Sequence, residues 1–235
     1  MYSIFKIQDT VLKVSIEAKL LMPEIQIIKN ENKLLHELVL CILSSQEKYE
    51  VALAIMKVFK KNNILRIPLD NIEFKKNKNQ IRHTLNNPVN FLFNNKDYFR
   101  RLRFFHKKGN YIIDTLENIY LNNLTINKIL KQNNCSFETR KNIIKYSHGL
   151  GPKQASMFLR NIGFYSEFAV LDKHVIDYMR IMGLTCIKEN SFSSLTSYEK
   201  IENIFIKYAE SINVNLLHLD LAIWTTMRTL NNYQK

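Results

Sequence analysis

The chain has 235 residues and contains 34 Lys and Arg against 21 Asp and Glu, which gives a formal net charge of +13. This length can bury a core in one large domain or in two smaller ones, and the basic balance favours a polyanion as the partner. Charged residues interrupt the first twenty positions, and no later apolar run approaches the length of a membrane span, which argues against a secreted or membrane-spanning protein.

Helical periodicity dominates the sequence, and strand-like alternation is scarce beyond the first fifteen residues. Five glycines and four prolines fit a mostly helical protein with short connections. Leu34 to Phe59 contains one or two strongly apolar helices, and the polar Ser44-Ser45-Gln46 breaks the pattern between them. The sequence therefore predicts a mainly α fold.

Two basic stretches follow. Lys75 to Asn79 is rich in Lys and Asn, and we expect it to be a solvated loop or a helix end. Tyr98 to Tyr120 mixes basic and aromatic side chains. Such a mixture can bind phosphates and stack on bases, but an amphipathic helix with a basic outer face gives the same pattern, so both interpretations stay open.

The three cysteines, Cys41, Cys135 and Cys186, are far apart in the sequence. Their spacing indicates neither a disulfide framework nor a zinc site, and three thiolates cannot supply an ordinary iron–sulfur cluster. We expect buried neutral thiols and no metal site.

Gly149-Leu150-Gly151 forms a predicted tight turn between two helical patterns. After the turn, Ala155, Phe158, Leu159 and Ile162 have the spacing of an apolar helix stripe, and Gly163 stands where a C-terminal cap is expected. Glycines allow close backbone approach and expose amide groups that suit a nucleic-acid phosphate. Most such turns only connect helices, so the turn alone is weak evidence of binding.

Two residues near this turn have side chains that could act chemically. Lys153 begins the second helix, and an unprotonated amine there could form a Schiff base with a sugar C1′; an ordinary lysine is protonated, because its pKa is near 10.4. Asp172 follows an apolar segment and precedes a helical stripe, so it is a predicted helix N-cap. An ionised carboxylate at that place could also stabilise positive charge on the sugar.

The segments GLGPKQASMFLRNIG and AVLDKH resemble the helix-hairpin-helix/GPD superfamily of DNA glycosylases, and they are most similar to the archaeal-type second family of 8-oxoguanine DNA glycosylase/AP lyases. This resemblance implies that Lys153 attacks C1′ and that Asp172 assists. His148, Pro152 and Met157 depart from the family pattern, which leaves the identity of the excised base open.

Three further segments extend the resemblance. Gln46 matches the residue that fills the gap left by an extruded base, Phe105 is the candidate base-stacking residue, and Trp224 matches an indole that lies against the base. Gly149, Leu150, Gly151 and His174 complete the expected DNA contacts. Each of these residues also has an ordinary structural explanation as a helix end or as core.

The resemblance implies an enzyme of base excision repair. It would flip an oxidised purine, 8-oxoguanine, out of double-stranded DNA, displace the base with Lys153 and cleave the strand by β-elimination. No redox cofactor or catalytic metal is required, although a monovalent cation can sit at the hairpin. A glycosylase for another modified base, for instance in defence against foreign DNA, and a non-catalytic DNA-binding module remain as alternatives.

The expected architecture has two helical subdomains, with the helix-hairpin-helix motif at the cleft between them. Residues 1–34 and 147–235 would form one subdomain, which carries the hairpin and the catalytic residues, and residues 35–146 would form the other. We expect a monomer that acts inside the cell, in the cytoplasm and associated with the nucleoid, and that makes no membrane contact.

Overall fold

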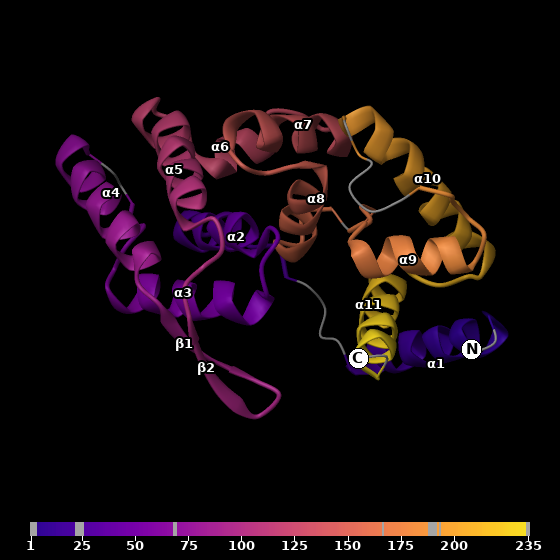
Figure 1. Ribbon diagram of the computed structural model, residues 1–235. Coiled ribbons are helices and arrows are strands. Elements are labelled where there is room, and N and C mark those ends of the chain that lie inside the picture. The colour runs from indigo at the N-terminus through magenta and orange to yellow at the C-terminus, as the bar shows by residue number, and fades with distance from the viewer. Residues whose placement is uncertain are drawn as a thin grey trace. The chain divides into compact units, whose positions relative to one another are not determined.

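The computed structural model describes residues 4–21, 26–67, 70–165, 167–187, 192 and 194–233 (Figure 1). The chain divides into two compact units. The central unit is Ile27–Ile162, and the terminal unit combines Met1–Gln26 with Gly163–Lys235. Nearly all regular structure is helical, so the predicted mainly α fold with two helical subdomains is confirmed.

The central unit is built around one apolar helix. Its elements are α2 (Glu31–Ser44), α3 (Tyr49–Lys61), α4 (Asn71–Asn86), β1 (Val89–Phe93), β2 (Lys96–Arg100), α5 (Phe105–Leu116), the π-helical turn η1 (Glu117–Leu121), α6 (Ile126–Leu130), α7 (Ser136–Tyr146) and α8 (Pro152–Asn161). Helix α2 packs against α3, α5, α6 and α8 (Figure 1). Every residue from Leu38 to Leu43 is buried, because a helix that is apolar all round must be covered by its neighbours.

The break between α2 and α3 falls where the sequence predicts it. Asn30 begins α2 by accepting a hydrogen bond from the Lys33 amide, and the helix ends at Ser44. Helix α3 then begins at Tyr49. Of the one or two apolar helices predicted, the structure has two, and the predicted polar break at Ser44-Ser45-Gln46 is confirmed.

The basic stretch Lys75 to Asn79 lies inside helix α4, so the expectation of a loop or helix end was wrong. Asp70 caps the helix by accepting hydrogen bonds from the amides of Ile72 and Glu73. The buried side of α4 contains Phe74, Asn77, Ile81 and Leu85. Its apolar residues are too sparse to give a clear periodic signal among so many lysines and asparagines.

A two-stranded hairpin follows α4, which the sequence analysis did not predict. Strands β1 and β2 are antiparallel, with register from Val89 opposite Arg100 to Phe93 opposite Lys96. Asn94 and Asn95 both have positive φ, at 50° and 57°, as a two-residue hairpin turn requires. Five-residue strands next to basic helices leave only a short alternating pattern.

The terminal unit contains α1 (Ile4–Leu21), α9 (Lys173–Ile181), α10 (Leu195–Ser211) and α11 (Leu216–Tyr233), and α11 packs against the other three (Figure 1). The alternation at the start of the chain does not form a strand. Val11, Ser15 and Ala18 lie on the buried face of α1, with helical spacing.

The predicted division between subdomains differs from the observed one at both boundaries. Helix α8 packs against α2 and α7, and the Ile28 amide donates to the Ile162 carbonyl at 2.9 Å. These contacts place the hairpin and Lys153 in the central unit instead of the terminal one. The terminal unit still joins both ends of the chain.

The cysteines follow the sequence prediction only in part. All three are free, but Cys41 alone is buried, whereas Cys135 and Cys186 are exposed. Burial raises the pKa of the Cys41 thiol well above its usual value, so this thiol is neutral.

Candidate DNA-binding and catalytic site

The predicted glycine hairpin connects α7 to α8 and packs against helix α5. Gly149 has a φ of 79°, and a Cβ at this position would overlap the ring of Tyr111. The His148 amide donates to the Thr115 hydroxyl at 2.9 Å, and Leu150 is buried. Only glycine permits both this backbone conformation and the close approach of Tyr111.

Helix α8 begins immediately after the hairpin. Gly151 is its N-cap, and Pro152 occupies the first turn, where a missing amide hydrogen costs nothing. Ala155, Phe158 and Leu159 are buried, as predicted, and Gly163 after the helix has a φ of 71°. The free amides of this first turn form the kind of backbone surface that binds phosphate.

Lys153 lies in the first turn of α8 and is half-buried. Its positive charge slightly opposes the raised pKa of the Cys41 thiol on α2, so the Lys153 side chain is on the side of α8 that packs against α2. The guanidinium of Arg140 is fully buried and donates to the Ser156 hydroxyl at 2.9 Å, so that α7 is fastened to α8. Lys153 thus belongs to a helix that packs against α2 and α7, directly after the hairpin.

Asp172 is the N-cap of α9, as predicted. Its Oδ1 accepts a hydrogen bond from the Val175 amide at 2.9 Å, and the residue is half-buried. The other oxygen of the carboxylate can therefore act elsewhere while the cap stays formed.

The three residues before Asp172 are held by buried polar side chains that the sequence analysis missed. Glu202 accepts from the Ala169 amide, and Asp220 accepts from the Val170 amide, each at 3.0 Å. The Tyr198 hydroxyl accepts from the Leu171 amide and donates to the Ala169 carbonyl. These side chains occupy buried positions of α10 and α11, where helical periodicity alone gives no sign of a polar role.

His174 and Trp224 lie together in the terminal unit. Their rings meet edge to face with centroids 6.4 Å apart, and the Arg228 guanidinium lies 4.6 Å from the centroid of the Trp224 ring. Trp224 is half-buried, so part of the indole remains accessible. His174 also stands two residues after Asp172, which brings all three predicted residues of this unit to the start of α9 and the face of α11.

Gln46 lies at the turn between α2 and α3 and is exposed. Its φ is 52°, in the left-handed region that residues other than glycine rarely adopt. This conformation is compatible with a helix end and with the gap-filling role, which stays a prediction.

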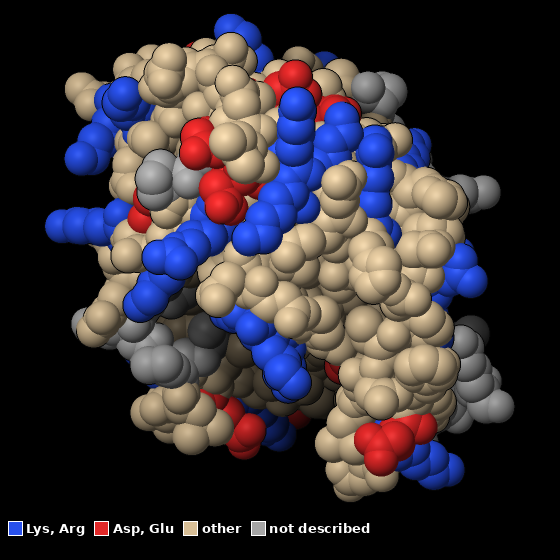
Figure 2. All heavy atoms as spheres, turned by 90° about the vertical axis from the view of Figure 1, so that its left-hand side faces the viewer, with Lys and Arg blue, Asp and Glu red and all other residues tan. Residues whose placement is uncertain are grey.

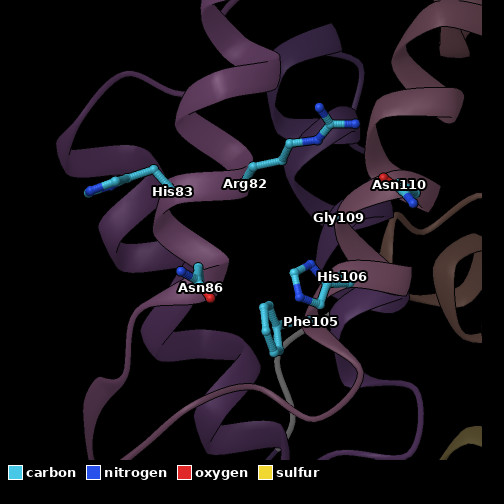
Figure 3. Close-up of a pocket in the computed structure, with 7 residues that line it drawn as sticks. All are labelled: Arg82, His83, Asn86, Phe105, His106, Gly109 and Asn110. Carbon is cyan, nitrogen blue, oxygen red and sulfur yellow. The ribbon is translucent and has the colours of Figure 1, made fainter.

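Phe105 points away from the hairpin side of α5. It lines a cleft of about 410 Å³ between α4 and α5, together with Arg82, His83, Asn86, His106, Gly109 and Asn110 (Figure 3). One helical turn along, a Cβ on Gly109 would meet Leu85 of α4 at 3.5 Å, which confirms the direction of this face.

Phe104 directly precedes α5 and is its N-cap. It stands four residues before the buried Lys108 and seven before Tyr111, which packs on the hairpin. Phe104 is 52% exposed and has a φ of 55°. Because Phe104 is exposed and does not line this cleft, we take it as a second candidate for the base-stacking residue, beside the predicted Phe105.

The basic and aromatic side chains between Tyr98 and Tyr120 contact one another. The Arg101 guanidinium lies 4.8 Å from the ring centroid of Phe105, that of Arg103 lies 5.6 Å from Phe104, and the Lys107 amine lies 5.6 Å from Tyr111. The interpretation as a helix with basic side chains is confirmed for α5, where Lys107 covers an aromatic ring, and binding of phosphates and bases by this segment stays a prediction.

A band of Lys and Arg side chains crosses the face that carries α4 (Figure 2). Helix α4 supplies Lys75, Lys76, Lys78 and Arg82, with Glu73 as its acidic residue. Within the described parts of the chain, no group of three or more His, Cys, Asp or Glu side chains could hold a metal ion. None of the helices in those parts is long and apolar enough to cross a membrane.

Residues 21–214 match the family Ogg-HhH, which is described as 8-oxoguanine DNA glycosylase. A curated 8-oxoguanine DNA glycosylase/AP lyase of Saccharolobus solfataricus is 28% identical over 199 residues, which cover 84% of this chain and 83% of that protein. One from Picrophilus torridus is 34% identical over 126 residues, or 52% of this chain and 54% of that protein.

Solved structures show the same fold. The 8-oxoguanine DNA glycosylase of Thermotoga maritima aligns with a TM-score of 0.69 at 23% identity, covering 94% of this chain and 96% of that one. The Methanocaldococcus jannaschii 8-oxoguanine glycosylase/lyase, solved with a 15mer DNA containing 8-oxoguanine, aligns with a TM-score of 0.64 at 22% identity over 93% and 87%. With the family match over most of its length, the chain belongs to the 8-oxoguanine DNA glycosylase family.

Proposed function

We propose that this protein is a DNA glycosylase with AP lyase activity that removes 8-oxoguanine from double-stranded DNA. The observation that carries the proposal is the half-buried Lys153, fixed in the first turn of α8 directly after a tightly packed glycine hairpin. Family membership and the named activities of the relatives support the same reaction.

The reaction begins with binding to the phosphate backbone, which the net charge of +13 favours. Flipping the damaged nucleotide costs a few kcal/mol, and less for a poorly paired base. Gln46 occupies the vacated place in the stack, while Phe104 and Trp224 contact the flipped base.

Lys153 then performs the covalent step. Its neutral Nζ forms a bond to C1′ as the glycosidic bond breaks, and the bonding electron pair leaves with the base, which takes up a proton. Asp172 stabilises the positive charge on the sugar and accepts a proton from the attached amine. The sugar ring opens to a Schiff base, and loss of the C2′ proton expels the 3′ phosphate by β-elimination.

The proposed chemistry needs neither a redox cofactor nor a catalytic metal. A monovalent cation held by hairpin carbonyls is compatible with the residues present. Among the described residues, the buried Ser147 hydroxyl at the start of the hairpin has no hydrogen-bond partner, so an oxygen ligand is available there. Because the substrate is DNA, we place the enzyme inside the cell, with the nucleoid as the expected location.

Borohydride trapping tests the proposal. On a duplex containing 8-oxoguanine, the wild-type protein should form a covalent adduct, and Lys153→Gln should form none because it lacks the amine. The exposed Lys131 provides a matched control, so Lys131→Gln should trap at the wild-type level. If an adduct formed only with other damaged bases, the proposed substrate would be wrong. Tight DNA binding without any adduct would reject the catalytic proposal.

A further inference from the structure

Two exposed residues of the described central unit, Gln46 and Phe104, adopt a left-handed backbone conformation although they are not asparagine, the residue that shares it elsewhere on this surface. Gln46, between α2 and α3, has a φ of 52°, and Phe104, before α5, has a φ of 55°. A left-handed conformation costs a side-chain-bearing residue about 1 kcal/mol or more. The surrounding contacts must therefore impose it, at both the proposed gap-filling residue and the proposed base-stacking residue.

A buried carboxylate lies between these two residues. The side chain of Glu47, next to Gln46, is 1% exposed. Its Oε2 accepts a hydrogen bond from the Arg103 amide at 2.7 Å, directly before Phe104, and its Oε1 accepts from Arg100 Nη2 at 2.9 Å. Oε1 also accepts from the Lys48 amide at 2.9 Å, which closes the turn that contains Gln46.

A buried lysine fixes the other end of the same turn. The Lys108 amine is almost fully enclosed and donates to the Leu43 carbonyl at 2.7 Å, where α2 ends and a free carbonyl needs a donor. The Lys108 amide also donates to the Phe104 carbonyl at 2.9 Å. Loss of hydration lowers the pKa of this amine to about 8, although Glu47 partly opposes the shift. Lys108 thus contacts both segments.

We infer that Glu47 and Lys108 are positioning residues that hold Gln46 and Phe104 in a fixed relation, so that gap filling and base stacking occur together. The inference rests on the proposed function. Buried charges are an inefficient way to gain stability, because the loss of hydration offsets much of their attraction. We therefore assign these two charged side chains the role of fixing the positions of Gln46 and Phe104.

The variant Glu47→Gln tests this role, because it keeps the size of the side chain but removes the charge. Excision of 8-oxoguanine in single turnovers should slow by about 10-fold or more, since small misplacements of contacting groups have effects of that order. Cleavage of a preformed abasic site in single-stranded DNA needs neither gap filling nor base stacking, and should stay within about 3-fold of wild type. Glu73→Gln, an equal charge change on exposed α4, should affect neither rate.

Adding Glu47→Gln to a variant that lacks both positioned side chains distinguishes a positioning role from a general structural role. In the Gln46→Ala, Phe104→Ala background, Glu47→Gln should change excision by less than about 3-fold, because residues that act as a unit are not additive. An undiminished effect in that background, or an equal loss of abasic-site cleavage, would overturn the inference. Should Glu47→Gln fail to fold, Arg100→Met removes the ion pair from the other side and carries the same expectations.

A fluorescence measurement tests the positioning role even if 8-oxoguanine is not the substrate. A duplex with a tetrahydrofuran abasic analogue and a neighbouring 2-aminopurine reports filling of the gap by its fluorescence, whichever base the enzyme excises. Wild type should alter this fluorescence on binding, and Glu47→Gln should alter it less at saturating protein. Equal signals from the two proteins would contradict the positioning role even if 8-oxoguanine is not the substrate.

Discussion

Asp172 combines a structural and a proposed catalytic role in one side chain. One oxygen caps α9 through the Val175 amide, and the negative charge is what the reaction would use. Asparagine is about as good an N-cap as aspartate, but it carries no charge. The two roles can therefore be separated by exchanging a single group.

We predict that Asp172→Asn keeps the free energy of unfolding within about 1 kcal/mol of wild type. Its excision rate should fall by about 100-fold or more, as expected when a general acid–base group is lost. Urea unfolding and single-turnover excision provide the two measurements. A large loss of stability together with activity would mean that Asp172 acts mainly as a cap.

Gly149 is constrained both by its backbone and by its neighbour. Its φ of 79° excludes most side chains, and a Cβ would also overlap Tyr111. We predict that Gly149→Ala destabilises the protein by about 2 kcal/mol or more and weakens DNA binding. Gly183 is the matched control, since its φ is 70° and nothing lies within 4 Å of the added atom. If Gly183→Ala and Gly149→Ala lost equal unfolding free energy, the overlap with Tyr111 would add nothing to the cost of the left-handed backbone.

At the level of residues, the sequence analysis located the hairpin, the cap at Asp172 and the polar turn at Gln46, because each depends on a local pattern of residue types. It did not locate Glu47, Lys108 or Tyr198. Their hydrogen bonds join segments far apart in the sequence, and charged residues such as Glu47 and Lys108 are ordinarily exposed. Burial of these polar groups becomes visible only in the folded chain.

The contact between α2 and α5 places a charged group in the interior of the central unit. Lys108 projects from α5 to the end of α2, and its pKa is lowered to about 8 from a usual value of about 10.5. Between these pH values the unfolded chain binds more protons at this site than the folded chain does. The free energy of unfolding therefore rises between about pH 8 and pH 10.5. The stabilisation linked to the Lys108 amine is complete above about pH 10.5 and is lost as the pH falls towards 8.

We predict that Lys108→Met removes this pH dependence. The difference in unfolding free energy between wild type and variant should increase in favour of wild type from pH 7 to pH 11, by up to about 3 kcal/mol. Urea unfolding at several pH values measures it. The neighbouring exposed Lys107 is the control, and Lys107→Met should follow wild type across this range. If the unfolding free energies of Lys108→Met and wild type changed in parallel with pH, the pKa of the Lys108 amine would not be lowered by folding.

Among the elements, the apolar helices α2, α3 and α8 could be predicted because their burial gives strong periodic patterns. Helix α4 and the β1–β2 hairpin could not. The buried face of α4 includes Asn77, whose side chain accepts from the Leu65 amide, so a polar residue occupies a core position. The hairpin depends on paired asparagines at positive φ instead of the glycine that usually signals such a turn.

At the scale of the whole molecule, the sequence correctly indicated a helical protein whose two ends join in one unit. The predicted boundary of that unit was misplaced, because the hairpin was assigned to the same subdomain as the residues after it. Packing of α8 against α2 assigns it to the central unit, so Lys153 and Asp172 come from different units. A reaction that uses both residues would need the central and the terminal unit in the same molecule.

Identification of the residue that carries the sugar is the most direct test of the central claim. After borohydride reduction on DNA containing 8-oxoguanine, the adduct can be digested and its modified peptide sequenced by mass spectrometry. We predict that the modification lies on Lys153, in the first turn of α8. Modification of another residue, such as Lys108, or an unmodified protein after complete excision of the base, would contradict the account.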